Sequence, residues 1–136
     1  MTVQPVVRRV AAAVLRRLDG RILLLRRADS HQTNPGQWCF VTGYVEDGES
    51  PRDAAIRELE EELGVNGTPI REGVIVNVVL SPEWRLDVYP FLFETGDIEV
   101  VLDREHSTFV WIMPTEVGKY DTVPKLADDL ISLGLL

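Results

Sequence analysis

The chain has no second cysteine, no excess of basic residues and no long hydrophobic run, and each absence excludes a class of structure or partner. With Cys39 as the only cysteine, no internal disulfide can form, and its place between Trp38 and Phe40 favours a small buried hydrophobic residue over a nucleophile. No apolar run approaches the roughly 20 residues that a membrane-spanning helix needs. The segment MTVQPVVRRV carries its basic pair late and alternates in polarity, which favours an edge strand over a cleavable leader. We therefore expect a cytoplasmic protein that crosses no membrane.

Acidic residues outnumber basic ones, and the net charge is −8. A protein with this balance has no surplus of cations to release counter-ions, so neither duplex DNA nor an anionic membrane is an expected partner. The chain also has no basic stripe with interleaved aromatic residues, which is the footprint of a protein that binds an RNA strand. Its 136 residues, 45% of them hydrophobic, contain no repeat and no dividing linker, and they predict a single domain over residues 1–136.

One segment, GYVEDGESPRDAAIRELEEELGV at residues 43–65, concentrates carboxylates at regular offsets. A helix advances about 100° per residue, so Glu58, Glu61 and Glu62 fall within one third of its circumference. Like charges this close repel one another unless a cation neutralises them. Carboxylate oxygens are hard ligands that suit Mg²⁺ or Mn²⁺, so the spacing predicts a divalent metal site on this face of the helix.

The flanks of this segment predict where the helix begins and ends. Ser50 is suited to cap its start, Pro51 fits the first turn, and Gly64 suits a left-handed stop. Glu60 lies away from the other three glutamates on the predicted helix. The side chains expected to pack into the core from a neighbouring face are Ala55, Ile56, Leu59 and Leu63.

Strands account for most of the remaining pattern. Asp19-Gly20 is suited to a tight hairpin turn, and residues 28–37 have the composition of a loop. A C-terminal helix is expected over residues 124–133, with Thr122 or Val123 marking its start. Strands with two main helices predict a mixed α+β fold. Strand composition is found at residues 6–18, 21–27, 38–42, 73–80, 85–94 and 108–112.

The carboxylate segment as a whole resembles the Nudix box. That pattern is a glycine, five residues, Glu49, seven residues, and then Arg-Glu-aliphatic-x-Glu-Glu-x-Gly-aliphatic, and every specified position is filled from Gly43 to Val65. The resemblance implies a metal-dependent hydrolase of diphosphates linked to another group, folded as an α/β/α sandwich with a mixed sheet between helices. It also implies that the Gly43 carbonyl is a metal ligand and that Arg57 pairs with Glu49 to orient the loop against the helix.

Outside the box, a late glutamate and a pair of arginines are candidates for the site. Glu105 precedes His106 and a predicted strand, and many Nudix relatives carry a glutamate there that completes the metal site or accepts a proton from water. His106 itself is the weaker candidate, since one histidine beside a strand is more often structural. Alternation sends one of Arg26 and Arg27 to the inner side of the sheet, where a guanidinium binds phosphate bidentately, and we assign Arg26 this role.

The stretch WCFVTG ahead of the box resembles the Nudix branch that includes dihydroneopterin triphosphate pyrophosphatase and related nucleoside triphosphate hydrolases. That branch shares the Leu-x-Arg-Arg ending of the second strand and a late Glu-His before a Trp-containing strand. The likeness implies that Arg26 and Thr42 contact the substrate, with a purine or pteridine triphosphate as first choice. The pterin enzyme has a long insert that this chain lacks between residues 80 and 94, so its own substrate is not carried over. The aromatic side chains that could stack on a ring are Trp38, Phe40, Trp84 and Tyr89.

The mechanism that follows is attack by a metal-activated water on a phosphorus of the diphosphate bridge. Glu58, Glu61 and Glu62 hold Mg²⁺, and one of them or Glu105 accepts the proton of the water. A triphosphate would yield a monophosphate and pyrophosphate. The pattern leaves open which carboxylate is the base and how many metal ions bind.

Several alternatives stay open at this point. The substrate could be a dinucleoside polyphosphate or a nucleotide sugar, cut at its own diphosphate bridge. A non-catalytic nucleotide sensor is disfavoured by the intact box, and an RNA-processing hydrolase is disfavoured by the acidic balance. The sequence does not fix the oligomeric state, although dimers are frequent among relatives and the hydrophobic segment 74–80 is suited to contribute to a homodimer.

Overall fold

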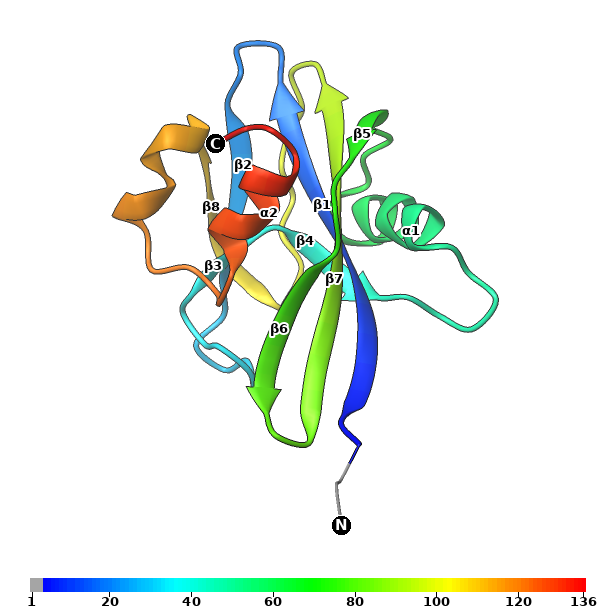
Figure 1. The fold of residues 1–136 in the computed structure, drawn as a ribbon. Coiled ribbons are helices and arrows are strands. Elements are labelled where there is room, and N and C mark those ends of the chain that lie inside the picture. The colour runs from blue at the N-terminus through cyan, green and yellow to red at the C-terminus, as the bar shows by residue number, and fades with distance from the viewer. Residues whose placement is uncertain (1–3) are drawn as a thin grey trace.

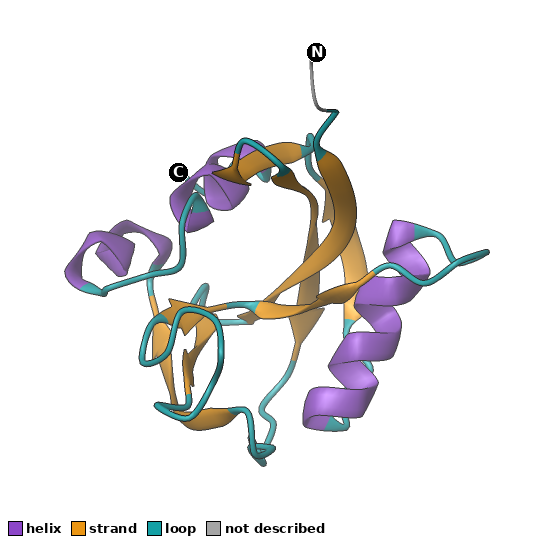
Figure 2. Ribbon diagram, turned by 90° about the horizontal axis from the view of Figure 1, so that it is seen from below, coloured by secondary structure: helices purple, strands orange, loops and turns teal. Residues whose placement is uncertain are grey.

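The computed structural model describes residues 4–136, and residues 1–3 of the N-terminal segment lie outside it. Within this part of the chain, strands form one mixed sheet, with helix α1 on one side and helix α2 and the 3-10 helix η1 on the other (Figures 1 and 2). The predicted α/β/α sandwich is confirmed. The elements are β1 (Val6–Arg17), β2 (Ile22–Arg27), β3 (Trp38–Cys39), β4 (Val41–Tyr44), α1 (Pro51–Leu63), β5 (Thr68–Glu72), β6 (Val76–Ser81), β7 (Trp84–Thr95), β8 (His106–Ile112), η1 (Pro114–Lys119) and α2 (Leu126–Ser132).

Separate hydrophobic clusters hold the two helices against the sheet. Leu59 and Leu63 of α1 pack in one cluster, and Leu126 and Leu130 of α2 pack in another. Burial of a leucine side chain contributes roughly 1.5–3 kcal/mol, so each cluster fixes its helix firmly. Ile56 was expected in the first cluster, but its side chain is 36% exposed because it projects beside the helix face that contacts the sheet.

Strand β1 begins at an edge of the sheet, as expected for the N-terminal segment, because residues 6–9 pair with β7 alone, and it enters the interior of the sheet from Val10 onward. It pairs in parallel with β7 along its whole length, and from Val10 to Ala13 it pairs on its other side with β4. The predicted turn at Asp19-Gly20 is present, with Gly20 at φ 89°. The hairpin that it closes is short, because β1 and β2 share only the Arg16–Ile22 pair before β4 takes the place of β2 beside β1.

The strand expected over residues 38–42 is divided at Phe40. The part before it, β3, pairs with β2, whereas the part after it, β4, pairs with β1. This division moves the chain from one strand neighbour to another just before α1, and it thereby brings Thr42 and Gly43 beside that helix. Strand β5 was not predicted, because all its residues are exposed and no apolar alternation marks it.

The ends of α1 are those that the sequence predicts. The Ser50 hydroxyl accepts a hydrogen bond from the Asp53 amide at 3.1 Å, and Gly64 adopts the left-handed conformation at φ 66°. Helix α2 is shorter than predicted and follows Lys125, at φ 68°, rather than Thr122 or Val123. In the described residues no helix has the length and apolar character needed to cross a bilayer.

Candidate active site

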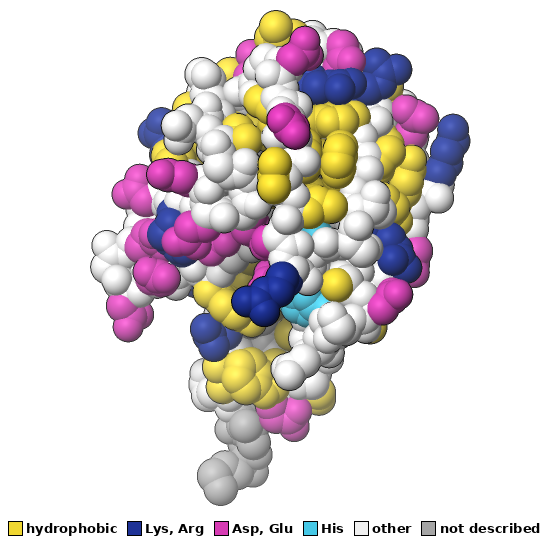
Figure 3. Space-filling model, turned by 180° about the vertical axis from the view of Figure 1, so that it is seen from behind, with side chains coloured by type: hydrophobic (Ala, Val, Ile, Leu, Met, Phe, Trp, Pro, Cys, Tyr) yellow, Lys and Arg dark blue, Asp and Glu magenta, His cyan; other side chains and the backbone are white. Residues whose placement is uncertain are grey.

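A cleft of about 580 Å³ lies beside α1 and gathers residues from both ends of the chain. Helix α1 contributes Glu58, Glu61 and Glu62 to its lining, and the segment before β8 contributes Asp103 and Glu105. Its volume is in the range of small-ligand sites. The face in Figure 3 shows acidic side chains gathered on the side of α1, close to hydrophobic side chains. Other lining residues that matter below are Arg27, Thr42, Gly43, Val78, Val88 and Asp129.

Arg57 organises the carboxylates at the start of this cleft. Its Nε and Nη2 donate to the two oxygens of Glu49 at 2.8 and 3.0 Å, the pairing that the Nudix resemblance implied. Its Nη1 donates to Glu58 at 2.9 Å and to Glu61 at 3.2 Å. The Arg57 hydrogen bonds lower the pKa of Glu49 to about 2, so this carboxylate stays charged. Arg57 also donates to the Tyr44 carbonyl, which ties the loop to the helix.

Gly43 lies directly under the Glu58 side chain. A Cβ atom on Gly43 would overlap the carboxyl carbon and Oε1 of Glu58, so a side chain at this position and the present placement of Glu58 exclude each other. Burial raises the pKa of Glu58, while its bond to Arg57 opposes that rise. Gly43 has no side chain, and its absence leaves the space that the Glu58 carboxylate occupies.

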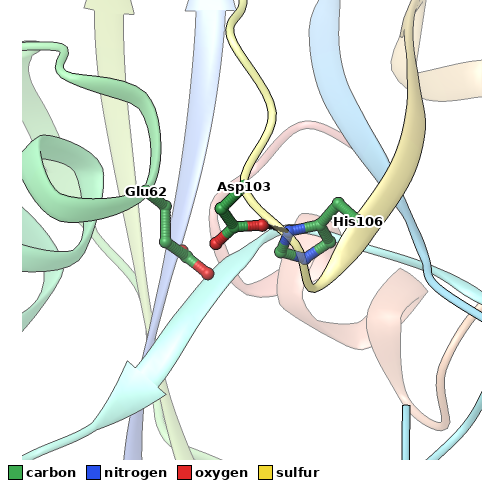
Figure 4. Close-up of side chains that lie close together, drawn as sticks. All are labelled: Glu62, Asp103 and His106. Atoms are coloured by element: carbon green, nitrogen blue, oxygen red, sulfur yellow. Dashed lines mark hydrogen bonds and ion pairs between the residues drawn. The ribbon is translucent and has the colours of Figure 1, made fainter. Parts of the chain in front are cut away.

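Glu62 is the carboxylate whose negative charge is least compensated by hydrogen bonds and neighbouring groups. Burial, followed by the charges of Glu58 and Asp103, raises its pKa to about 9, and its Oε2 atom is buried without a hydrogen-bond partner among the described residues. Figure 4 shows its carboxylate directed toward Asp103, which accepts a hydrogen bond from His106 Nδ1 at 2.8 Å. Ligand atoms of Glu62, Asp103 and His106 lie within 4.8 Å of one another. A half-buried carboxylate that is crowded by other acids and has one buried, unpaired oxygen fits a divalent cation as its missing counter-charge.

Arg27, not Arg26, lines the cleft. Leu23 and Leu25 of β2 pack in the cluster that holds α1, so alternation along this strand places Arg27 on the same side of the sheet. Arg27 donates from Nε to the Thr33 carbonyl at 2.9 Å and from Nη2 to the Thr33 hydroxyl at 2.8 Å. Arg26 instead donates to Ser107 at 3.3 Å and faces Asp29. Alternation predicted that one of the pair turns inward, and the packing of the two faces of β2 decides which one.

The aromatic side chains proposed for stacking are not among the residues that line the cleft. Trp38 packs in the cluster of α2 and meets the Tyr120 ring edge-on, with the ring centroids 5.3 Å apart. Phe40 is buried in the same cluster. Thr42 does line the cleft, and so does Cys39. Burial raises the pKa of the Cys39 thiol to about 11, which fits its predicted role as a small buried residue.

Sequence reasoning missed Asp103, Arg27 and Asp129. Asp103 stands two residues before Glu105 in a hydrophilic stretch, and no spacing relates it to the carboxylates of α1. The signal for Arg27 was present in the Arg-Arg pair. No pattern marks Asp129, because an acid in an amphipathic helix is ordinarily exposed, whereas this one is 7% exposed.

Comparison with known proteins supports the same family over nearly the whole chain. A family model for the NUDIX domain matches residues 6–132. The CTP pyrophosphohydrolase of Escherichia coli (strain K12) is 36% identical over 120 residues, covering 85% of this chain and 82% of that protein. The crystal structure of the MutT protein from Methanosarcina mazei Go1 superposes with a TM-score of 0.80 at 26% identity, covering 97% of this chain and 96% of the other.

The dihydroneopterin triphosphate pyrophosphohydrolase of E. coli has the same fold. It superposes with a TM-score of 0.73 at 23% identity, covering 94% of this chain and 96% of the other. The carboxylate helix, the left-handed glycine that ends it and the Arg57–Glu49 pair all occupy the positions that the Nudix box specifies. The chain therefore belongs to the Nudix family of hydrolases.

Proposed function

We propose that this protein hydrolyses a nucleoside triphosphate to a monophosphate and pyrophosphate with Mg²⁺, or alternatively Mn²⁺, as cofactor. The observation that carries the proposal is the cleft itself. It is lined by Glu62, whose buried Oε2 atom has no hydrogen-bond partner in the part of the chain that the structure describes, and by the guanidinium of Arg27. The first group calls for a cation and the second for an anion, and a metal–polyphosphate complex supplies both. The relative named as a CTP pyrophosphohydrolase supports a nucleoside triphosphate as the substrate class.

The carboxylates divide into ligands and residues that position them. We assign Glu58, Glu61, Glu62 and Glu105, with the Gly43 carbonyl, as the groups that hold the metal, and Asp103 and His106 as a further pair beside Glu62. The bound metal would lower the pKa of a water molecule and offset charge on the phosphates. One of the glutamates accepts the proton from the attacking water. Arg57 is a positioning residue, since its guanidinium holds Glu58 and Glu61 in place.

Arg27 replaces Arg26 as the proposed phosphate contact. Its guanidinium already donates to Thr33 and stands near His31, so the side chain is held in place before a substrate arrives. Burial, together with the Arg27 charge, lowers the pKa of His31, so the imidazole is neutral and adds no second positive charge. Thr42 remains a proposed substrate contact, because it lines the cleft beside Gly43. Trp38 is withdrawn from this role, since it packs in the core.

The experiment is a substrate panel. Purified protein with Mg²⁺ is incubated with nucleoside triphosphates, dihydroneopterin triphosphate, dinucleoside polyphosphates and nucleotide sugars, and the products are identified by mass. Monophosphate and pyrophosphate from a nucleoside triphosphate, abolished by EDTA, are expected. Turnover confined to dinucleoside or sugar substrates would replace the substrate class, and no metal-dependent turnover of any compound would favour a nucleotide sensor.

The remaining predictions concern the setting of the enzyme. We propose that the protein is a single domain in the cytoplasm and that it binds neither nucleic acid nor a membrane. We also propose that it forms a homodimer to which the segment 74–80 contributes. Val74 and Val79 in that segment are 75% and 72% exposed, which supports a contact there. Sedimentation analysis of the protein with and without the substitution Val79→Lys tests the dimer.

A further inference from the structure

A thiol and an imidazole meet in the lining of the cleft. Cys39 Sγ lies 3.8 Å from His106 Nε2, and both residues line the cleft. Cys39 is 1% exposed and His106 is 8% exposed, so both side chains are closely packed. Cys39 is on β3, His106 begins β8, and both strands pair with β2. The sheet therefore fixes the distance between this sulfur and this nitrogen in the folded protein.

His106 is oriented as metal-binding histidines usually are. Its Nδ1 atom donates to Asp103 at 2.8 Å, which leaves Nε2 without a proton on the side of Cys39. Histidines that bind metals nearly always donate their other ring N–H to a carboxylate or a carbonyl, which fixes the tautomer. In a tetrahedral zinc site with Zn–S of about 2.3 Å and Zn–N of about 2.0 Å, the sulfur and the nitrogen lie about 3.5 Å apart. The observed distance of 3.8 Å is close to that spacing.

Glu62 brings an unpaired oxygen to the same cluster. Ligand atoms of Glu62, Asp103 and His106 lie within 4.8 Å of one another (Figure 4), and Glu62 Oε2 has no hydrogen-bond partner within residues 4–136. Burial, and to a smaller extent the charges of Glu62 and Asp103, raises the pKa of the Cys39 thiol to about 11. The thiol therefore keeps its proton near neutral pH until a cation displaces it. A cation bound among these groups takes the place of that proton and offsets the carboxylate charges.

We propose that Cys39 Sγ, His106 Nε2 and an oxygen of Glu62 bind Zn²⁺ at a site separate from that of Mg²⁺, with Asp103 as the residue that orients His106. Mg²⁺ prefers six oxygen ligands, whereas Zn²⁺ takes four ligands and accepts sulfur, nitrogen and oxygen. Three ligands from the protein leave the fourth position of the tetrahedron for water. Binding releases the thiol proton to solvent, and no atom changes its oxidation state.

Glu62 belongs both to this site and to the proposed Mg²⁺ site, so the two cations compete for it. Zn²⁺ held by Cys39 and His106 would draw an oxygen of Glu62 away from Mg²⁺ and thereby inhibit hydrolysis. This consequence rests on the proposed function, whereas Zn²⁺ binding itself does not. Zn²⁺ is therefore expected to inhibit the wild-type protein in the presence of Mg²⁺, and Cys39→Ser should require at least about tenfold more Zn²⁺ for half-inhibition.

The direct test is metal binding without any substrate. Zn²⁺ is titrated into the purified protein by calorimetry, and Co²⁺ serves as a spectroscopic probe, because a bond from thiolate to Co²⁺ gives a charge-transfer band in the near ultraviolet. The wild-type protein is expected to show this band, and added Zn²⁺ should remove it. In Cys39→Ser and Cys39→Ala the band should be absent, and each variant should bind Zn²⁺ at least about tenfold more weakly.

Further variants separate this site from the carboxylates of α1. His106→Gln should weaken Zn²⁺ binding as much as the cysteine variants do, and Asp103→Asn should weaken it about tenfold. His31→Gln is the matched control, because His31 contacts Arg27 and Thr33 rather than this cluster, and its Zn²⁺ affinity should equal that of the wild type. Affinity for Mn²⁺, a hard cation measured by paramagnetic resonance, should change less than about threefold in Cys39→Ser.

Two results would overturn the inference and leave the proposed function standing. One is Co²⁺ binding by the wild-type protein without the thiolate band. The other is a Zn²⁺ affinity that agrees within about threefold between the wild type and both cysteine variants, whose folding is checked by circular dichroism. If the wild type hydrolyses no nucleoside triphosphate, the proposed function fails, and the Co²⁺ band still decides whether Cys39 binds a metal.

Discussion

Each end of the cleft contains a carboxyl group with one buried oxygen that has no hydrogen-bond partner among residues 4–136, and the surroundings of the two groups differ. Glu62 lies among other acids, where additional negative charge raises its pKa to about 9. Asp129 lies on a helix whose inward neighbours are leucines, and burial followed by the Asp128 carboxylate raises its pKa. A crowd of carboxylates can be satisfied only by a cation, whereas a solitary carboxyl group in an apolar wall is satisfied by a neutral hydrogen-bonding partner. The same chemical group therefore needs a different kind of partner at each end of the cleft.

The largest effect on kcat is expected at the end of the cleft where the carboxylates of α1 gather. Glu62→Gln and Glu61→Gln each remove a charge that the metal requires, and each should lower kcat at least about 100-fold while the circular dichroism spectrum is unchanged. The control is Glu60→Gln, since Glu60 is exposed on the opposite part of the same helix and should keep wild-type rates. Wild-type turnover by both active-site variants would remove the assignment of these glutamates.

A smaller loss is expected when the glutamates are kept but displaced. In Gly43→Ala the added methyl group overlaps the Glu58 carboxylate, so this side chain must move away from its present position. We expect kcat/KM to fall about 10- to 100-fold, as when a group that orients a ligand is lost. Gly96→Ala is the matched control, because a Cβ atom there meets nothing within 4 Å. Equal activities of the two variants would contradict the close-approach argument.

The role of the Arg57 guanidinium in positioning Glu58 and Glu61 can be tested next. Arg57→Lys keeps the positive charge but cannot bind Glu49 through two nitrogens while also reaching Glu58, so activity should fall about tenfold. The Mg²⁺ concentration for half-maximal rate should rise as well, a change that a simple loss of stability would not cause. Arg52→Lys, at an exposed position of the same helix, should change neither quantity.

The smallest effect is expected at Asp129, and it concerns the free energy of unfolding rather than the catalytic rate. The folded pKa of Asp129, about 7, lies above its ordinary value of 3.8, so the folded protein retains a proton that the unfolded chain loses between these values. The contribution of this group to stability is therefore present below pH 4 and is lost as the pH rises toward 7. Asp129→Leu should raise the free energy of unfolding by roughly 1–3 kcal/mol at pH 8 and by less at pH 5. Urea denaturation at both pH values measures this difference, and a destabilised variant at pH 8 would count against a costly buried acid.

Local chemistry was sufficient to predict the helix that carries the carboxylates. Ser50 and Gly64 mark its ends through hydrogen bonds and backbone angles within a few residues, and the spacing of Glu58, Glu61 and Glu62 follows from helical periodicity. The strands were predicted less fully, because β5 has no apolar alternation and the split at Phe40 depends on which partner each half meets.

The sequence by itself determined the family, the sandwich fold and the row of acids, since each depends on a contiguous pattern or on short-range spacing. Only the tertiary structure decided that Arg27 rather than Arg26 turns inward, that Asp103 and His106 stand beside Glu62, and that Asp129 is buried. Those outcomes depend on strand register and on packing between segments far apart in the chain. Local patterns could not predict them, because the face of a strand or helix that becomes covered depends on segments that are distant in the sequence.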